Sequence, residues 1–208
     1  MPLPPKNIRV LHVYKTYYPD TTGGVEMVLC QLMRALKPMG VENRLLVLSP
    51  MANPVCVEHP EAQVIRCRTS FEMASNPMSL SALGEFRRQL DWADIVHYQF
   101  PWPFGDLLHW LHGGRKPSVV SYQSDIVRQK NLMRLYRPLM RRFLASVDRV
   151  CATSPNYRET SAVLSQLRKR VDVIPNGLDS ARCPPATTEV LEQWRSRLGR
   201  GFFLFVGV

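Results

Sequence analysis

Short apolar runs rich in β-branched residues recur along this 208-residue chain. Most of them are nearly continuous rather than alternating, which is typical of strands covered on both faces in a parallel sheet. Because parallel strands need long crossover connections, this feature restricts the chain to folds in which helices flank a sheet. The runs occupy residues 8–13, 44–48, 64–67, 94–98, 118–122, 149–153 and 171–174.

Segments of helical period separate these runs. In residues 25–36, for example, Val25, Leu29 and Leu32 fall on one stripe. The alternation predicts right-handed βαβ units and an α/β fold with a doubly wound, mainly parallel, Rossmann-like sheet. Ligands of such sheets bind outside the carboxyl ends of the strands, so the loops after the strands are the candidate sites. Further helices are expected at 80–90, 105–111, 131–144 and 156–164.

The C-terminal part of the chain differs in composition. Residues 180–188 contain two prolines and small polar residues, which indicates a linker. A charged helical stretch, 189–198, and a strongly apolar stretch, 199–208, follow. We therefore predict one Rossmann-like domain over residues 1–179, and over 180–208 a linker with the first strand of a truncated second domain.

Charge and cysteine content exclude several classes of protein. The net charge of +10 favours anionic partners, either lipid, nucleic acid or phosphorylated small molecules, or simply a solvated basic surface. The five cysteines contain no C-x-x-C, so neither a disulfide framework nor a metal site is expected. The chain shows no signal-peptide h-region and no apolar stretch of about 18 residues, which predicts a cytoplasmic protein.

Two loops carry candidate binding residues. Gly23 and Gly24 stand at the start of a helix, where backbone N–H groups favour a phosphate, although a tight turn also wants glycine. Neither G-x-G-x-x-G nor the P-loop pattern is present. Residues 100–104 crowd three aromatics and two prolines into a loop suited to sugar rings or to a packed corner. His97 fits a core histidine, whereas His109 looks surface-facing.

The stretch VVSYQSDIVRQK (119–130) resembles a buried strand that opens into a cleft. Its polar cluster contains Tyr122, Gln123 and Asp125. Asp125 can carry a charge, whereas Gln123 can donate and accept hydrogen bonds but cannot titrate near neutral pH.

A basic amphipathic segment follows. Arg134, Arg137, Arg141 and Arg142 alternate with apolar residues, with Pro138 between them. This pattern suits a helix on an anionic membrane surface, or a core-facing helix with a solvated basic side. No nucleic-acid-binding module is recognisable, so no nucleic-acid partner is expected.

Five stretches in a fixed order carry a family resemblance: IRVLHVYKTYYPDTTGGVE, ADIVHYQFPWPFGDLL, VVSYQSDIVRQK, ATSPNY and VDVIPNGLD. Together they resemble the N-terminal domain of the retaining GT-B glycosyltransferases of family 4. The chain is most similar to bacterial mannosyl- and rhamnosyltransferases that assemble O-antigen, in lipopolysaccharide, and other surface polysaccharides.

The resemblance implies two Rossmann-like domains that face each other across a cleft. The first would bind a lipid-linked or saccharide acceptor, and the second would bind a GDP- or UDP-linked sugar and carry an E-x7-E motif. FFLFVGV (202–208) resembles the first strand of that second domain. The implied activity is transfer of a hexose or deoxyhexose with retention, without a resident cofactor, at the inner face of the cytoplasmic membrane. Residues 1–208 alone are not expected to catalyse this transfer.

The resemblance also assigns roles to positions. It implies catalytic roles for Gln123 and Asp125. In this family a histidine usually occupies the positions of both Gln99 and Gln123, so both departures replace histidine by glutamine. The other implied positions are Gly23, Gly24, Gln99 and Tyr122 for substrate binding and Asn176, Gly177 and Asp179 for the interdomain hinge.

Two alternatives remain open from the sequence. The glutamines and the missing donor half would also suit a non-catalytic, degenerate or truncated homologue that binds glycan or anionic lipid. A different α/β enzyme that binds a sugar phosphate or a nucleotide is the third hypothesis.

Overall fold

A computed structural model gives the structure of this chain. It describes residues 7–73, 76–112, 114, 116–126, 130–167, 171–177, 179, 185–199, 201–203 and 205, with the backbone alone at 130–132. The chain divides into two compact units, Met1–Gly177 and Leu178–Val208, and each is described by itself.

The first unit is built on a mainly parallel sheet with the strand order β10-β9-β8-β7-β1-β2-β4-β3. Only β3 at the edge of this sheet runs antiparallel to its neighbour among the described strands. The α/β class predicted from the apolar runs is confirmed. The strands are β1 (Ile8–Val13), β2 (Val41–Ser49), β3 (Cys56–Glu58), β4 (Gln63–Arg68), β7 (Ile95–Phe100), β8 (Ser118–Tyr122), β9 (Arg149–Ala152) and β10 (Val171–Val173).

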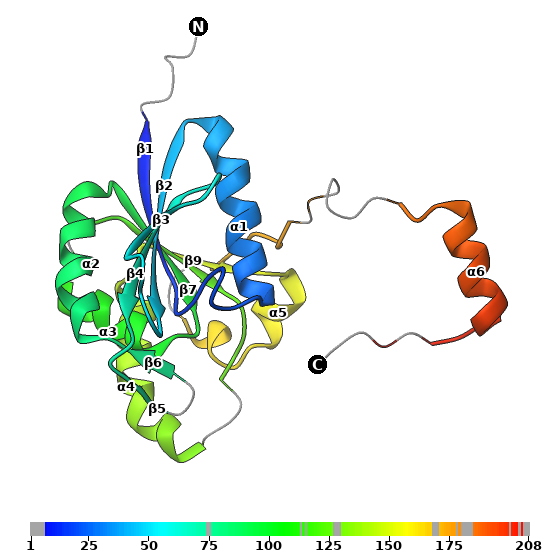
Figure 1. The fold of residues 1–208 in the computed structure, drawn as a ribbon. Coiled ribbons are helices and arrows are strands. Elements are labelled where there is room, and N and C mark those ends of the chain that lie inside the picture. Colours follow the sequence, from blue (N-terminus) through cyan, green and yellow to red (C-terminus); the bar gives the residue numbers. More distant parts are fainter. Residues whose placement is uncertain are drawn as a thin grey trace, which may run out of the picture. The chain divides into compact units, whose positions relative to one another are not determined.

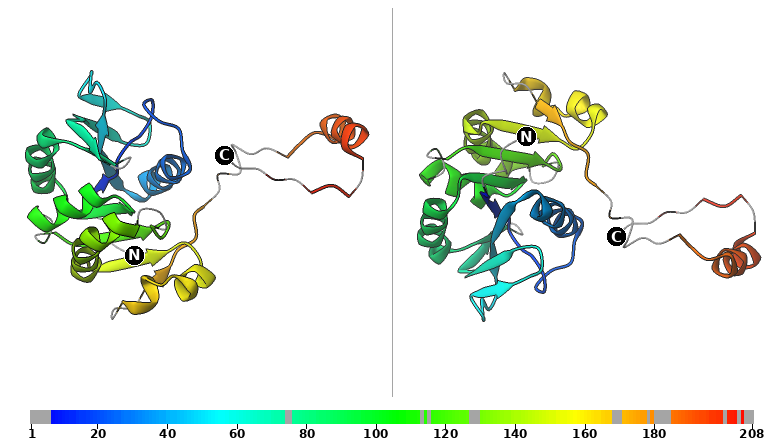
Figure 2. Two further views of the ribbon diagram at one scale, coloured as in Figure 1. Left: turned by 90° about the horizontal axis from the view of Figure 1, so that it is seen from below. Right: turned by 90° about the horizontal axis from the view of Figure 1, so that it is seen from above.

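Helices cover both faces of this sheet. α1 lies on one face, and α2, α3 and α4 lie on the other (Figures 1 and 2). All helices expected from periodicity are present, although the expected helix at 156–164 is divided into a short α-helix and a 3₁₀ turn. The helical elements are α1 (Gly24–Leu36), η1 (Lys37–Met39), α2 (Leu80–Trp92), α3 (Pro103–His112), α4 (Lys130–Ser146), α5 (Pro155–Thr160) and η3 (Leu164–Gln166).

Alternating side chains of the central strands build the two cores. In β2, Leu46 and Leu48 join the larger core, which also receives residues from α2, α3 and α4. Their neighbours Leu45 and Val47 point the other way and pack with Leu29 of α1. Both faces of the central strands are therefore buried, which explains why their sequences are nearly continuous in apolar residues.

The structure contains short strands that the sequence did not predict. β5 (Phe71–Met73) and β6 (Asn76–Met78) pair as an antiparallel hairpin outside the main sheet. No residue of β3, β5 or β6 is buried, so these strands leave no apolar run in the sequence.

The aromatic loop after β7 is a packed corner. Phe100, Trp102 and Phe104 are all buried in the larger core. The Trp102 Nε1–H donates to the Pro77 carbonyl oxygen at 3.3 Å and so ties the β5–β6 hairpin to this loop. These aromatic faces are consequently not available to stack on a sugar ring.

His109 corrects an expectation. It is buried rather than surface-facing, with 3% of its surface exposed. Its ring nitrogens contact the Tyr98 hydroxyl at 3.2 Å and Ser146 Oγ at 2.9 Å. Leu108 of α3 packs in the core, and the neighbouring His109 is buried between α3 and α4. Burial of this ring is possible because both of its nitrogens have hydrogen-bond partners.

The second unit contains α6 (Thr188–Leu198), which matches the expected charged helix. Thr187 caps it, since the threonine side chain accepts a hydrogen bond from the Val190 N–H. The described residues 201–203 and 205 form no strand, contrary to the expectation for 199–208. A strand needs a neighbour for its backbone groups, and the described part of this unit offers none. Residues 204 and 206–208 and most of the expected linker lie outside the described residues.

Candidate functional site

The strand order places a topological switch point between β1 and β7. From β1 the chain winds outward through β2 and β4, and it then returns to β7 on the opposite side of β1. Connections on the two sides diverge there, and in folds of this class ligands bind at such a point, outside the carboxyl ends of the strands. The loop that contains Gly23 and Gly24 follows β1, and Gln99 lies near the end of β7.

Side-chain alternation gives the two faces of β7 and β8 different characters. Val96, Tyr98 and Phe100 of β7 join the core under α2, α3 and α4. The residues between them, His97 and Gln99, therefore point to the face that carries α1. In β8 the same alternation sends Val120 and Tyr122 into the core and Ser121 to the polar face, with Gln123 next in line.

Three side-chain amides meet at this edge of the sheet. The Gln123 Nε2–H donates to Gln99 Oε1 at 2.9 Å, and the Asn176 Nδ2–H donates to Gln123 Oε1 at 3.0 Å. The Gln123 backbone N–H donates to the Phe100 carbonyl oxygen at 3.0 Å, which fixes the start of the loop after β8. We call Gln99, Gln123 and Asn176 the amide cluster. It joins two positions with implied site roles to one from the implied hinge, across β7, β8 and the segment after β10.

The amide cluster ends in a buried donor without a partner. Gln99 is 3% exposed, and its Nε2 atom has no hydrogen-bond partner within the described part of the chain. Leaving a buried N–H donor unpaired costs about 1–3 kcal/mol, so such groups recur at binding sites, where a ligand supplies the acceptor.

A chain of hydrogen bonds crosses four strands below the amide cluster. His12 Nε2 contacts Asn43 Oδ1 at 3.1 Å, His12 Nδ1 contacts His97 Nδ1 at 2.8 Å, and His97 Nε2 contacts Ser121 Oγ at 2.9 Å. Asn43 Nδ2 already donates to the Met33 carbonyl oxygen at 3.0 Å, so Asn43 Oδ1 must accept from His12. His12 Nδ1 then accepts from His97, and His97 Nε2 accepts from Ser121.

This chain of bonds requires both histidines to be neutral. Burial lowers the pKa of His12 to about 4, against the opposing hydrogen bond to Asn43. Burial and the neighbouring His12 lower the pKa of His97 to about 3. The two residues therefore act as a fixed polar support for β7 and β8 rather than as proton carriers near neutral pH. His97 is the satisfied core histidine that its place in the strand predicts.

Asp125 and Tyr122 form a second group beside the amide cluster. The Tyr122 hydroxyl donates to Asp125 Oδ1 at 2.7 Å, and the Ser161 hydroxyl donates to the same oxygen at 2.8 Å. Tyr122 is fully buried and stacks on Phe100 with ring centroids 4.4 Å apart. Asp125 thus ties the loop after β8 to the end of α5, and the Tyr122 ring lies beneath the surface.

Gly23 and Gly24 lie at the N-terminus of α1 as expected, but the carboxylate of Glu26 lies beside Gly23. Glu26 accepts hydrogen bonds from Thr16 Oγ1 at 3.0 Å and from Thr21 Oγ1 at 2.7 Å. A Cβ atom on Gly23 would lie 2.5 Å from Glu26 Oε2, so the carboxylate folds back over this glycine. Glu26 was not singled out from the sequence, although its place three residues after the N-cap is the spacing of a capping box.

The other implied hinge positions are less informative. Gly177 is exposed and ends the first unit, with open space where a Cβ would stand. Asp179 belongs to the second unit.

The basic residues of α4 lie outside the core. Arg134, Arg137, Arg141 and Arg142 are all exposed, while Phe143 and its apolar neighbours pack inward. A groove of about 540 Å³ runs between α4 and the segment 162–167, with an apolar floor that includes Leu144 and Val163 and with Arg137 and Arg141 at its sides.

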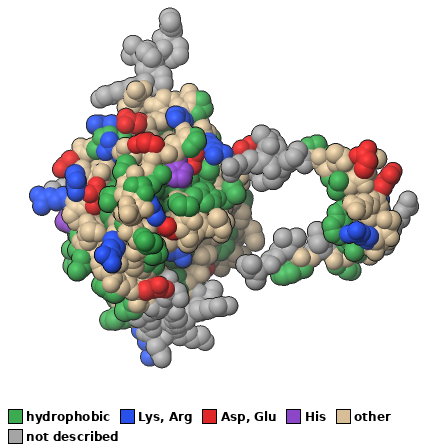
Figure 3. Space-filling model, viewed as in Figure 1, with side chains coloured by type: hydrophobic (Ala, Val, Ile, Leu, Met, Phe, Trp, Pro, Cys, Tyr) green, Lys and Arg blue, Asp and Glu red, His purple; other side chains and the backbone are tan. Residues whose placement is uncertain are grey.

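Other charged side chains are mixed in sign. On the face drawn in Figure 3, Lys and Arg side chains are interspersed with Asp and Glu. Within the described residues, no group of three or more His, Cys, Asp or Glu side chains could hold a metal ion. No helix in that part of the chain has the length and apolar character that a membrane span requires.

Comparison with known proteins adds named relatives. The chain is 51% identical over 201 residues to the D-rhamnosyltransferase WbpZ of Pseudomonas aeruginosa, which covers 97% of this chain and 53% of WbpZ. It is 45% identical over 200 residues to the O-antigen chain mannosyltransferase C of Escherichia coli, which covers 96% of this chain and 54% of that protein. The chain thus spans about half the length of these curated relatives.

Solved structures share the fold. Sucrose-phosphate synthase from Thermosynechococcus elongatus matches 93% of this chain and 53% of its own, with a TM-score of 0.64 and 15% identity. The Anabaena protein HepE in complex with UDP matches 92% and 50%, with a TM-score of 0.59 and 14% identity. A family model, Glycosyltransferase Family 4, matches residues 22–182, which hold the whole amide cluster. This chain belongs to glycosyltransferase family 4.

Proposed function

We propose that this chain is the acceptor-side half of a retaining glycosyltransferase. The full-length protein would transfer a hexose or deoxyhexose, such as mannose or rhamnose, from a GDP- or UDP-linked donor to a lipid-linked or saccharide acceptor. The names of the two curated relatives support transfer of D-rhamnose or mannose and a role in O-antigen assembly. The UDP complex of HepE, a protein of the same fold, supports a nucleotide-linked donor.

The amide cluster is the observation that carries this proposal. It lies at the carboxyl edge of the sheet beside the switch point, and it holds a buried N–H donor on Gln99 that lacks a partner in the described structure. An amide cannot remove a proton, so Gln99 and Gln123 would contribute orientation and hydrogen bonding. In the reaction that the family resemblance implies, the bond from the sugar C1 to the phosphate oxygen breaks, and the acceptor oxygen bonds to C1. The leaving phosphate takes the acceptor proton.

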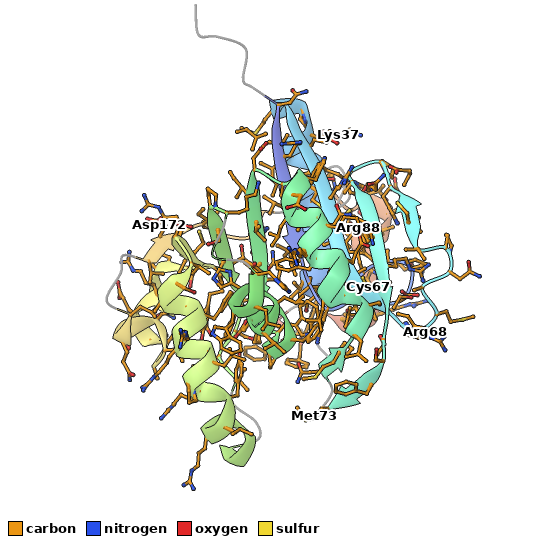
Figure 4. The ribbon with its side chains drawn as sticks, turned by 90° about the vertical axis from the view of Figure 1, so that its left-hand side faces the viewer. Lys37, Cys67, Arg68, Met73, Arg88 and Asp172 are labelled. Carbon is orange, nitrogen blue, oxygen red and sulfur yellow. The ribbon has the colours of Figure 1, made fainter. Side chains whose placement is uncertain are left out.

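We propose that the protein works at the inner face of the cytoplasmic membrane. Exposed arginines on α4 and the groove beside them would meet anionic lipid head groups. The β5–β6 hairpin and the first turns of α4 project at the same end of the first unit, as Figures 1 and 4 show, and Met73 points outward there. Phe71, Met73 and Leu135 are exposed at this end.

A transfer assay tests the main proposal. The full-length gene product is incubated with GDP-D-rhamnose, GDP-D-mannose or UDP-glucose and a lipid-linked saccharide, and the products are resolved by mass spectrometry. We expect transfer from at least one donor and none by residues 1–208 alone. Robust transfer by residues 1–208 alone would contradict the two-domain proposal. Absence of transfer by the full-length protein would favour the non-catalytic alternative.

The Gln123→His variant of the full-length protein separates the two alternatives further. If glutamine is a working substitute, the wild type is already fast, and histidine changes the rate by less than about tenfold. A gain of several orders of magnitude with histidine would identify the wild type as a degenerate enzyme.

A further inference from the structure

We propose that Asn176 is a positioning residue that sets the direction of the hydrogen bonds through the amide cluster. In that direction Gln99 presents an N–H donor to the reacting hydroxyl oxygen of the acceptor. The inference rests on the proposed transferase function, since it assigns a task to Asn176 within that same site. Asn176 itself would not touch the substrate and would act through Gln123.

The direction follows from the chemistry of primary amides. Each side chain has one donating and one accepting end, so the two links of a three-amide chain point the same way. In the structure Asn176 donates to Gln123 at 3.0 Å and Gln123 donates to Gln99 at 2.9 Å. The donor that remains is Gln99 Nε2, which is buried. If the chain ran in reverse, Gln99 would present its carbonyl oxygen instead.

Asn176 is the member of the amide cluster that determines which of these two directions the hydrogen bonds take. It is exposed, so water can satisfy the end of its amide that does not face Gln123. Gln99 is 3% exposed, so its free end depends on a ligand. A residue at position 176 that can only accept would force Gln123 to turn its NH₂ group outward and would reverse both links.

The direction matters because the acceptor hydroxyl has both a proton and lone pairs. When Gln99 donates to the hydroxyl oxygen, the hydroxyl proton stays free to pass to the leaving phosphate oxygen as C1 changes partners. With the chain reversed, the hydroxyl would donate its proton to Gln99 Oε1. The acceptor would still bind, but its proton would point away from the phosphate.

The test is the Asn176→Asp variant of the full-length enzyme, because aspartate has the same shape and only accepts hydrogen bonds near neutral pH. We expect kcat to fall about tenfold to a hundredfold, while KM for the acceptor saccharide changes less than about threefold. The Asn176→Gln variant keeps an amide donor at an exposed position, and we expect its kcat to stay within about threefold of the wild type.

Asn156→Asp is the matched control. Asn156 is exposed in α5, so this variant adds the same charge without entering the amide cluster. We expect wild-type kcat from it, and an unchanged melting temperature for the 208-residue chain carrying Asn176→Asp.

Wild-type kcat in Asn176→Asp, in an enzyme whose wild type is active, would overturn this inference alone. A raised KM with unchanged kcat would also overturn it, and so would a loss in Asn176→Gln equal to that in Asn176→Asp. An inactive wild type would overturn the proposed function together with it.

Discussion

At the scale of single residues, the role of a polar side chain depends on its hydrogen-bond partners, which the sequence does not show. Gln123 and Asp125 stand two positions apart, yet their side chains belong to different groups. Gln123 joins the amide cluster, whereas Asp125 accepts from Tyr122 and Ser161. Sequence spacing could identify these two positions but not their partners. Asn176 follows β10 and Ser161 ends α5, and both lie far from them in the sequence.

Alanine substitution at Gly23 and at the neighbouring Gly24 should affect stability differently. An alanine at Gly23 would place its Cβ 2.5 Å from Glu26 Oε2, so the carboxylate must move away from its two threonine donors. We expect Gly23→Ala to lower the free energy of unfolding by about 1–2 kcal/mol. Urea titration followed by circular dichroism measures this loss.

Gly24→Ala is the internal control. Nothing lies within 4 Å of the position that its Cβ would take, and Gly24 is the first residue of α1. We expect a change within about 0.5 kcal/mol, or a small gain, because alanine is the better helix former. Equal losses in the two variants would contradict the role assigned to the Glu26 carboxylate.

At the scale of elements, periodicity predicted the long helices and the central strands, because their burial is itself periodic. The strands β3, β5 and β6 were not predicted, because none of their residues is buried and no apolar run marks them. The difference between the two faces of β7 was not predicted either: its polar residues, His97 and Gln99, share the face opposite to Tyr98. The polar face becomes meaningful only when the neighbouring strand aligns Ser121 with it.

The histidine pair that links β1 to β7 predicts a pH dependence of stability. Both histidines are neutral in the fold, with pKa values lowered to about 4 for His12 and about 3 for His97, against 6.5 as the ordinary value. Below about pH 6.5 these two histidines bind protons in the unfolded chain but stay neutral in the folded chain. The stability that they contribute is therefore full above this pH and falls as the pH drops toward 4. Each histidine contributes a slope of up to about 1.4 kcal/mol per pH unit.

Urea unfolding of residues 1–208 at several values between pH 7.5 and 5 measures this slope. Carboxylates with lowered pKa values, such as Asp94 at about 2, act at lower pH. Burial raises the pKa of Asp106 well above its ordinary value and gives a slope of the opposite sign, so the difference in slope between the wild type and a histidine variant is the quantity that tests the prediction. The His97→Gln variant keeps a donor and an acceptor but cannot titrate, so its slope should differ from that of the wild type by up to about 1.4 kcal/mol per pH unit. Equal slopes in the wild type and in His97→Gln would contradict the prediction.

The basic face of α4 predicts binding to anionic membranes. Each arginine near an anionic surface contributes about 1 kcal/mol, so replacing Arg134, Arg137 and Arg141 together by glutamine should weaken vesicle binding about a hundredfold. Sedimentation with phosphatidylglycerol vesicles measures this change, and 0.5 M salt should abolish the difference.

A triple variant of equal charge serves as the control. Arg87 and Arg88 are exposed on α2 and Arg149 at the start of β9, outside α4 and outside the lining of the groove beside it. Replacing these three by glutamine should leave vesicle binding within about threefold of the wild type. Equal losses in both triple variants would indicate attraction by net charge alone.

At the scale of the whole molecule, the sequence predicted the class of fold, because alternation of strand and helix leaves few topologies. The position of the site at the strand ends stays a prediction. The family resemblance contributed the expected roles. Neither could reveal that the implied hinge segment donates a hydrogen bond into the site, since that contact joins residues 53 positions apart. The role of the second unit as part of a donor domain stays a prediction.

The division into two units predicts how the chain responds to truncation. Every residue of α6 is exposed, including Trp194 at 51%, and the residues of both hydrophobic cores precede residue 178. Removing residues 178–208 should therefore leave the melting temperature within about 2 °C of the intact chain. A chain that ends at residue 170 is the contrasting case, because it also loses β10, which pairs with β9 and buries Val171. We expect that chain to melt at least about 5 °C lower. An equal loss in the chain that ends at residue 177 would show that residues 178–208 stabilise the first unit.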